Sequence, residues 1–134
     1  MGIFGGLFKK KVDPLEALRE RVEANPADAR LAQDLATQYA AKGFHARAVH
    51  YGRKAAQAYK AAGFAQKALS VLKSAQAWGT PTPELLQDLA DVLLELHHKE
   101  DARGTLLKLR QLHSGNAAEQ QKIDARLTEL GPRR

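Results

Sequence analysis

Cysteine is absent from this chain of 134 residues, so disulfides, thiolate catalysis and cysteine-ligated zinc are excluded. The absence fits a reducing compartment. No uncharged apolar run reaches the roughly 18 residues that a membrane-spanning helix needs. The N-terminus also lacks the succession of basic, apolar and small residues that marks an export signal. We therefore expect a cytoplasmic protein.

Strand and active-site patterns are lacking as well. Neither alternation of apolar and polar residues nor runs of β-branched residues occur, so no strand is predicted. There is no glycine-rich phosphate loop after a strand and no nucleophile elbow. His45 and His50 are five residues apart and diverge on a helix, while His97 and His98 fall at a helix junction, where a surface turn is the ordinary interpretation and a metal site the alternative. We expect no enzyme, no cofactor and no metal.

Acidic residues are missing from the middle of the chain. Between Leu35 and Pro83 there is no Asp or Glu, whereas seven basic residues occur there: Lys42, Arg47, Arg53, Lys54, Lys60, Lys67 and Lys73. The rest of the chain has 14 basic and 15 acidic residues, so the net charge of +6 belongs to this middle segment. A basic surface of this kind favours an acidic partner.

What is present is helical periodicity. Apolar residues recur at i, i+3 and i+4 in seven segments, which are separated by Gly, Pro or Asn except at the junction of His97 and His98. N-caps are expected at Asp13, Thr82 and Asn116, and Gly79 is expected to end a helix in the left-handed conformation. The predicted helices cover residues of about 14–24, 28–42, 45–62, 65–78, 83–97, 100–113 and 117–129.

A short phrase is repeated along these helices. Gly-Phe, three residues and Ala occur at 43–48 and again at 63–68, and a weaker version, His98-x-x-x-Ala102, places its alanine 34 residues after Ala68. Each version joins a turn to a small residue one helical turn further on, which is typical of helices that enter a repeated packing unit. The chain is therefore predicted to form a helical array.

Gly52 lies inside the predicted helix 45–62, where a glycine costs about 1 kcal/mol relative to alanine. Two explanations are open. Either another backbone approaches closely at this point, or the glycine is a tolerated small residue in a tight helical crossing.

The repeated phrase resembles the tetratricopeptide repeat (TPR). Aligned on the phrase, the segment 29–62 has the residues usual in that family at Leu35, Ala36, Tyr39, Ala48 and Ala55. The resemblance covers residues 14–129 and implies an all-α fold, a right-handed α-solenoid of about seven antiparallel helices. The two Gly-Phe phrases are 20 residues apart, which departs from the regular 34-residue period of the family. Because of this shorter spacing, the helix 45–62 is the second helix of one unit and the first helix of the next. An ordinary alanine-rich helical bundle is the alternative.

This resemblance also implies a binding surface, because the first helices of successive TPR units line a concave face. Its predicted centre is basic and its ends acidic, which suits a partner segment with a carboxylate or acidic stretch at its centre. A merely solvated helix face is the alternative. Nucleic acid is disfavoured, because the aromatic residues fall at turn or packing positions. Carried over by position, the groove holds Gln33, Asp34, Thr37, Arg53, Lys54, Gln57, Lys60, Gln87, Asp88 and Asp91.

Residues 1–12 form an arm of different composition, followed by a predicted helical domain at 13–130 and a tail at 131–134. Apolar side chains beside a lysine cluster are typical of a segment that docks on a membrane surface or a partner. Packing against its own repeat or a second subunit, and disorder, are the alternatives. The docking residues predicted in the arm are Ile3, Phe4, Leu7, Phe8, Lys9, Lys10 and Lys11.

Together these patterns predict a TPR-like adaptor that holds a partner protein. The arm is expected to be a second docking element. If the arm docks on a membrane, the protein would lie at the inner face of that membrane. A specialised chaperone that shields an aggregation-prone partner is a second hypothesis, and it requires an apolar groove. A basic protein associated with membrane or nucleic acid is a third. The sequence does not identify the partner.

Overall fold

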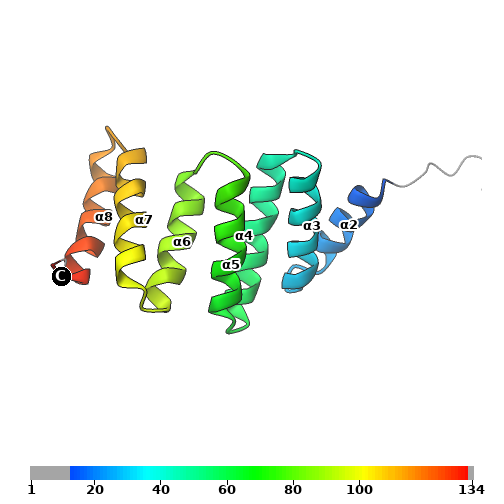
Figure 1. The fold of residues 1–134 in the computed structure, drawn as a ribbon, viewed down its shortest axis with the longest axis horizontal. Coiled ribbons are helices and arrows are strands. Elements are labelled where there is room, and N and C mark those ends of the chain that lie inside the picture. Colours follow the sequence, from blue (N-terminus) through cyan, green and yellow to red (C-terminus); the bar gives the residue numbers. More distant parts are fainter. Residues whose placement is uncertain (1–12, 133–134) are drawn as a thin grey trace, which may run out of the picture.

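The computed structural model describes residues 13–132, which form seven α-helices (Figure 1). The seven predicted helices are confirmed, with every boundary within two residues of the expected one. They are α2 (Pro14–Ala24), α3 (Ala29–Ala41), α4 (His45–Ala61), α5 (Ala65–Trp78), α6 (Pro83–Glu95), α7 (Lys99–Leu112) and α8 (Ala117–Leu130).

Side-chain caps fix the starts of four helices. The predicted caps Asp13, Thr82 and Asn116 each accept a hydrogen bond from a backbone N–H in the first turn of α2, α6 and α8. Asp28, which was not predicted as a cap, does the same for α3. The prediction for Gly79 is wrong: its φ of −171° and ψ of −170° are extended, because the chain leaves α5 directly into an extended connector to α6.

The repeated phrase corresponds to a repeated turn. Gly43 and Gly63 adopt φ values of 83° and 88°, the left-handed region that glycine enters without strain. At the third version His97 takes this position with a φ of 61°. In all three turns the amide of the next residue donates to the carbonyl five positions back, at 2.8–2.9 Å. The same helix-terminating geometry therefore recurs with and without glycine.

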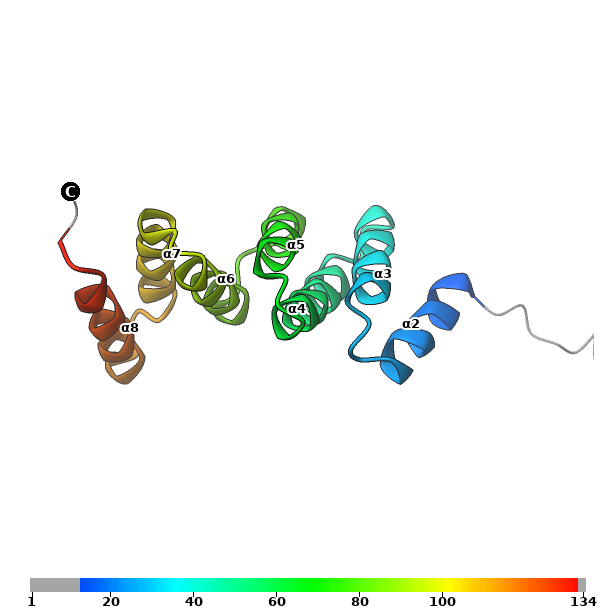
Figure 2. The ribbon, with the colours of Figure 1, turned by 90° about the horizontal axis from the view of Figure 1, so that it is seen from below.

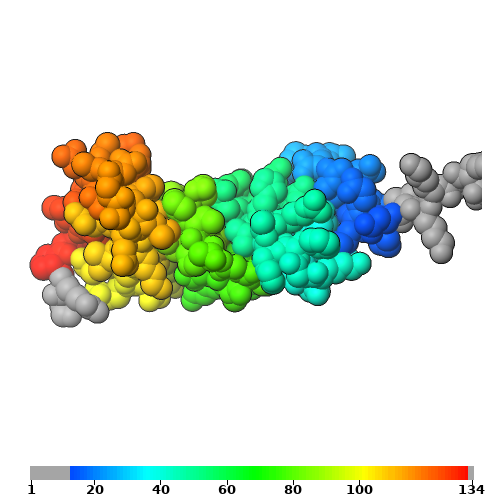
Figure 3. Space-filling view, turned by 90° about the horizontal axis from the view of Figure 1, so that it is seen from above, coloured from blue at the N-terminus to red at the C-terminus, as the bar shows by residue number. Residues whose placement is uncertain are grey.

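The helices form a linear array. Seen along the helix axes, α2, α4, α6 and α8 lie in one row and α3, α5 and α7 in a second row (Figure 2). Each helix packs mainly on its neighbours in the chain, and the surface follows sequence order along the long axis (Figure 3). This confirms the predicted all-α array. Helix α4 packs more extensively on α3 and on α5 than any other two helices pack, as expected for a helix shared by two units.

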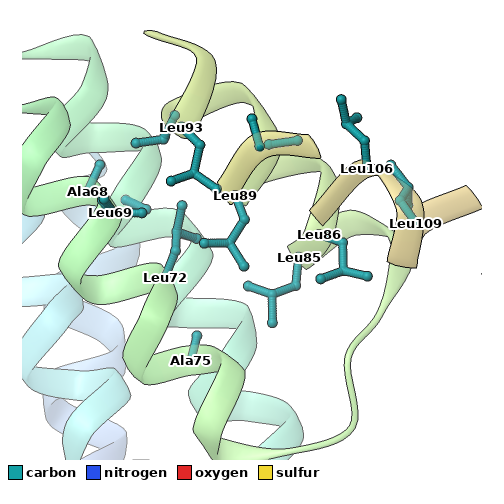
Figure 4. Close-up of a cluster of buried hydrophobic side chains, with 14 of the residues drawn as sticks. Ala68, Leu69, Leu72, Ala75, Leu85, Leu86, Leu89, Leu93, Leu106 and Leu109 are labelled. Carbon is teal, nitrogen blue, oxygen red and sulfur yellow. The ribbon is translucent and has the colours of Figure 1, made fainter. Parts of the chain in front are cut away.

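Two clusters of buried side chains make up the core. One extends from α2 to α5 and includes Leu35 and Tyr39, and the other extends from α4 to α8 (Figure 4). In Figure 4, Leu72 of α5 points toward the leucines of α6. Tyr59 and Trp78 pack against both clusters, so the core is continuous along the array. None of the helices in residues 13–132 is long and apolar enough to cross a bilayer.

Candidate functional site

The row of α2, α4, α6 and α8 forms one side of the array, which we call the groove face. Between α2 and α4 this face has an open recess of about 620 Å³. Small apolar side chains line most of it, and we call it the alanine hollow. Its lining consists of Val22, Pro26, Ala27, Ala32, Ala58, Ala61 and Ala62, with Glu23, Lys54 and Gln57 as the polar members.

A tyrosine and a lysine hold the glutamate of this lining. The buried Tyr51 donates its hydroxyl proton to Glu23 Oε1 at 2.7 Å, and Lys54 Nζ lies 3.5 Å from Glu23 Oε2. The Tyr51 hydrogen bond, together with the Lys54 charge, lowers the pKa of Glu23 below its ordinary value. Burial, followed by the bond to Glu23, raises the pKa of Tyr51. Glu23 is therefore an ionised carboxylate at neutral pH.

A smaller cleft of about 50 Å³ continues the groove face between α4 and α6. Gln57 lines both this cleft and the alanine hollow, so the two recesses adjoin. Lys60 lies in the cleft with Asp88 and Asp91, while Leu72 forms part of its apolar wall. The lining is thus mostly apolar in the alanine hollow and more charged in the cleft beside α6.

Three ion pairs connect the helices of the groove face in order. Glu23 of α2 pairs with Lys54 of α4. Arg53 Nε of α4 donates to Asp88 Oδ2 of α6 at 2.6 Å. Asp91 Oδ1 of α6 accepts hydrogen bonds from Arg126 of α8 at 2.8 Å and from Gln87 at 3.0 Å. We call these three pairs the ion-pair ladder. A ligand of this face would meet the side chains of this ladder.

The structure brings most of the predicted groove residues together. Arg53, Lys54, Gln57 and Lys60 on α4 lie beside Gln87, Asp88 and Asp91 on α6, within the two recesses or in the ladder. Their role in binding stays a prediction.

Gln33, Asp34 and Thr37 are not part of this surface. They belong to α3, which lies in the other row with α5 and α7 (Figure 2). Gln33 accepts a hydrogen bond from Tyr59, and Gln33 and Asp34 line a separate recess beside α5. Thr37 lies one turn further along the same stripe. These three residues therefore lie in the row opposite the α4 and α6 residues with which the sequence grouped them, and their role in binding stays a prediction.

The charge of the groove centre also differs from the expectation. The segment 35–83 has no acid of its own, but α2 and α6, outside it, supply Glu23 for Lys54 and Asp88 for Arg53. Lys60 is exposed and has no ion pair within residues 13–132. Lys60 therefore contributes an unpaired positive charge to the groove face.

Sequence reasoning missed Glu23, Arg126 and the apolar hollow. Ala58, Ala61 and Ala62 recur at i, i+3 and i+4, and this spacing was the available signal for the hollow. The acid partners carried no local signal, since they lie 31 or more residues away in the chain.

The Glu23 interaction predicts a pH dependence. A carboxylate whose pKa is lowered by folding contributes stability above its unfolded pKa and loses it as the pH falls through the folded value. Urea unfolding from about pH 6 down to pH 3 should therefore show a smaller loss of unfolding free energy for Glu23→Gln than for the wild type. Glu129→Gln, an exposed change on α8, is the control. Equal pH slopes for wild type and Glu23→Gln would contradict this assignment.

The histidines and the arm complete the predicted features. His97 and His98 form the turn before α7, and residues 13–132 contain no group of three or more His, Cys, Asp or Glu placed to hold a metal. The predicted docking residues at 3–11 lie outside the described part of the chain.

An array of antiparallel helices in two rows, in which each helix packs mainly on its neighbours in the chain, defines a helical-repeat architecture. The sequence matches no family profile and no curated protein. A solved structure with a similar helical arrangement is that of YrrB, described as a TPR protein with an unusual peptide-binding site. The match has a TM-score of 0.44 and 19% identity, and it covers 78% of this chain and 61% of YrrB. The chain therefore spans less than two thirds of the length of YrrB.

Proposed function

We propose that this protein is a non-catalytic adaptor that binds a segment of a partner protein along the groove face. One observation carries the proposal. The alanine hollow and the cleft of Lys60 adjoin on one side of the array, and both are open to solvent. A surface with an apolar recess and neighbouring fixed charges suits an extended or helical segment of another protein.

The side chains that line the two recesses indicate the composition of the partner segment. Small walls such as Ala58 and Ala61 admit apolar side chains, whose burial contributes about 25 cal/mol per Å² of apolar surface. Lys60 has no ion pair within the described chain, so a carboxylate of the partner can pair with it without breaking an existing ion pair. Lys54, at 3.5 Å from Glu23, can turn to a second carboxylate. The partner segment is therefore amphipathic, with an acidic residue beside its apolar face.

A peptide selection tests this proposal. Random twelve-residue peptides displayed on phage and selected on the full chain should be enriched in Asp or Glu beside apolar residues. Their affinity should fall about tenfold for Lys60→Glu, because a favourable charge contact becomes a repulsive one. It should remain unchanged for Lys73→Glu, an exposed lysine of α5 in the other row. Peptides without acidic residues that bind both variants equally would refute the acidic partner.

The chaperone hypothesis is the second candidate, and the apolar lining of the alanine hollow favours it. The dependence of binding affinity on salt concentration distinguishes the adaptor from the chaperone. Binding to Lys60 should weaken between low and high ionic strength, because charge contacts at an exposed lysine are screened. The affinity of an interaction confined to the alanine hollow should change little with salt.

Under either hypothesis the arm is proposed as a second docking element, toward the partner or an anionic membrane surface. Its docking residues are Ile3, Phe4, Leu7, Phe8 and the three following lysines.

A further inference from the structure

The alanine hollow adjoins α2, the helix that directly follows the arm. On α2, Glu16, Glu20 and Glu23 recur at i, i+4 and i+7, so they share one stripe. Glu23 lines the hollow and Glu16 lines a neighbouring recess between α2 and α4, so this stripe borders the groove face. Glu16 is paired with Arg19 on the same helix, whereas Glu20 is exposed and has no ion pair in residues 13–132.

The order of residues in the arm matches this surface in reverse. Going back from Asp13, the chain has first the lysines at 9–11 and then Phe8, Leu7, Phe4 and Ile3. Going along α2 from its N-terminus, Glu16 and Glu20 come first, and the alanine hollow, whose lining includes Glu23, lies at the end of the helix. Arg19 and Arg47 line the recess beside Glu16. A chain that turns back on α2 therefore places cations over carboxylates and apolar side chains over alanines.

We propose that in the unbound protein the arm folds back along α2, with Leu7 and Phe8 in the alanine hollow and the lysines at 9–11 over Glu16 and Glu20. The inference goes beyond the proposed function, because it concerns the free protein and holds whether or not the groove binds a partner. It gives the groove face an internal ligand, which a partner segment must displace.

Chain length permits this contact. The six residues from Leu7 to Asp13 span up to about 20 Å when extended. Helix α2, with 11 residues, is about 16 Å long. Leu7 and Phe8 can therefore reach the Val22 end of α2, where the hollow lies. Because the arm is joined to α2 by a short tether, its effective concentration at the hollow is in the millimolar range, so that even a weak apolar interaction can keep the arm bound there.

The absence of cysteine from the whole chain allows a direct test in the full-length protein. Leu7→Cys is combined with Ala61→Cys, an exposed position in the lining of the hollow. Copper phenanthroline oxidises the two thiols to a disulfide and accepts the two electrons, and the protons pass to water. The control pair combines Leu7→Cys with Ser74→Cys, an exposed position on α5 in the other row. Circular dichroism checks that both variants keep their helices.

We expect an intramolecular disulfide in the Leu7–Ala61 pair, formed at least tenfold faster than in the Leu7–Ser74 pair. Phe8→Cys with Ala61→Cys should behave in the same way. Mass spectrometry under non-reducing conditions distinguishes the products. Equal rates for the two pairs would overturn the proposal, because they would mean that the arm samples both rows alike. A product composed mainly of linked dimers would also overturn it and would identify the arm of a second copy as the occupant.

Discussion

Replacing Leu72 by alanine is expected to lower the free energy of unfolding by about 2–5 kcal/mol. Leu72 is fully buried between α5 and α6 (Figure 4). Truncation removes apolar contacts and leaves a cavity that the surrounding helices fill only in part. The site matters particularly because α5 and α6 are joined by an extended connector and pack less extensively than α4 and α5. Urea unfolding followed by circular dichroism measures the change.

The control for this prediction is Leu107→Ala on α7. Leu107 is 50% exposed, so its truncation removes little buried surface and should cost less than about 1 kcal/mol. A repeat array is stabilised by its nearest-neighbour interfaces, so Leu72→Ala should also lower the cooperativity between the N-terminal and C-terminal helices. Similar losses for the two variants would show that Leu72 does not hold α5 against α6.

Replacing Gly52 by leucine is the second change with a large expected effect, a loss of about 1–3 kcal/mol. A Cβ atom at Gly52 would lie 3.2 Å from Trp78 Cζ3 and 3.4 Å from Ala75 Cβ on α5. The space that glycine leaves in α4 is thus filled by side chains of α5. A leucine must force the two helices apart, and α4 and α5 form one of the most extensive contacts of the array.

Gly104→Leu on α7 is the matched control. It lies within a helix as Gly52 does, but nothing comes within 4 Å of a Cβ added there. Leucine has the better helix propensity, so this variant should gain up to about 1 kcal/mol. Trp78 is the only tryptophan, and its fluorescence should change in Gly52→Leu and not in Gly104→Leu. A Gly52→Leu variant as stable as Gly104→Leu would exclude close packing at Gly52.

The elements of the fold could be predicted because their signals are local. Caps such as Asp13 and Asn116 act within one turn of their helix, and the repeated turn depends on two or three adjacent residues. The connector after Gly79 was predicted less well, since its extended conformation depends on how α6 is placed against α5. Local sequence could not supply that placement.

The arrangement in space of the predicted groove residues could be anticipated from the sequence only in part. The residues of α4 and α6 lie together on the groove face, as the TPR pattern led us to expect, and their role in binding stays a prediction. Gln33 and Thr37 belong to α3 in the other row, and the sequence could not show this because only packing decides which row α3 joins. The pairing of Arg53 with Asp88 was missed for the same reason: charge counted along the chain does not show which helices meet.

The central claim is that a partner segment binds the groove face through the alanine hollow and Lys60. Nuclear magnetic resonance of the ¹⁵N-labelled chain, titrated with the tightest peptide from the selection described above, tests it most directly. The account predicts amide shift changes confined to the groove-facing parts of α2, α4 and α6, which Lys60→Glu abolishes and Lys73→Glu retains. Shift changes confined to α3, α5 and α7, unaffected by Lys60→Glu, would contradict it.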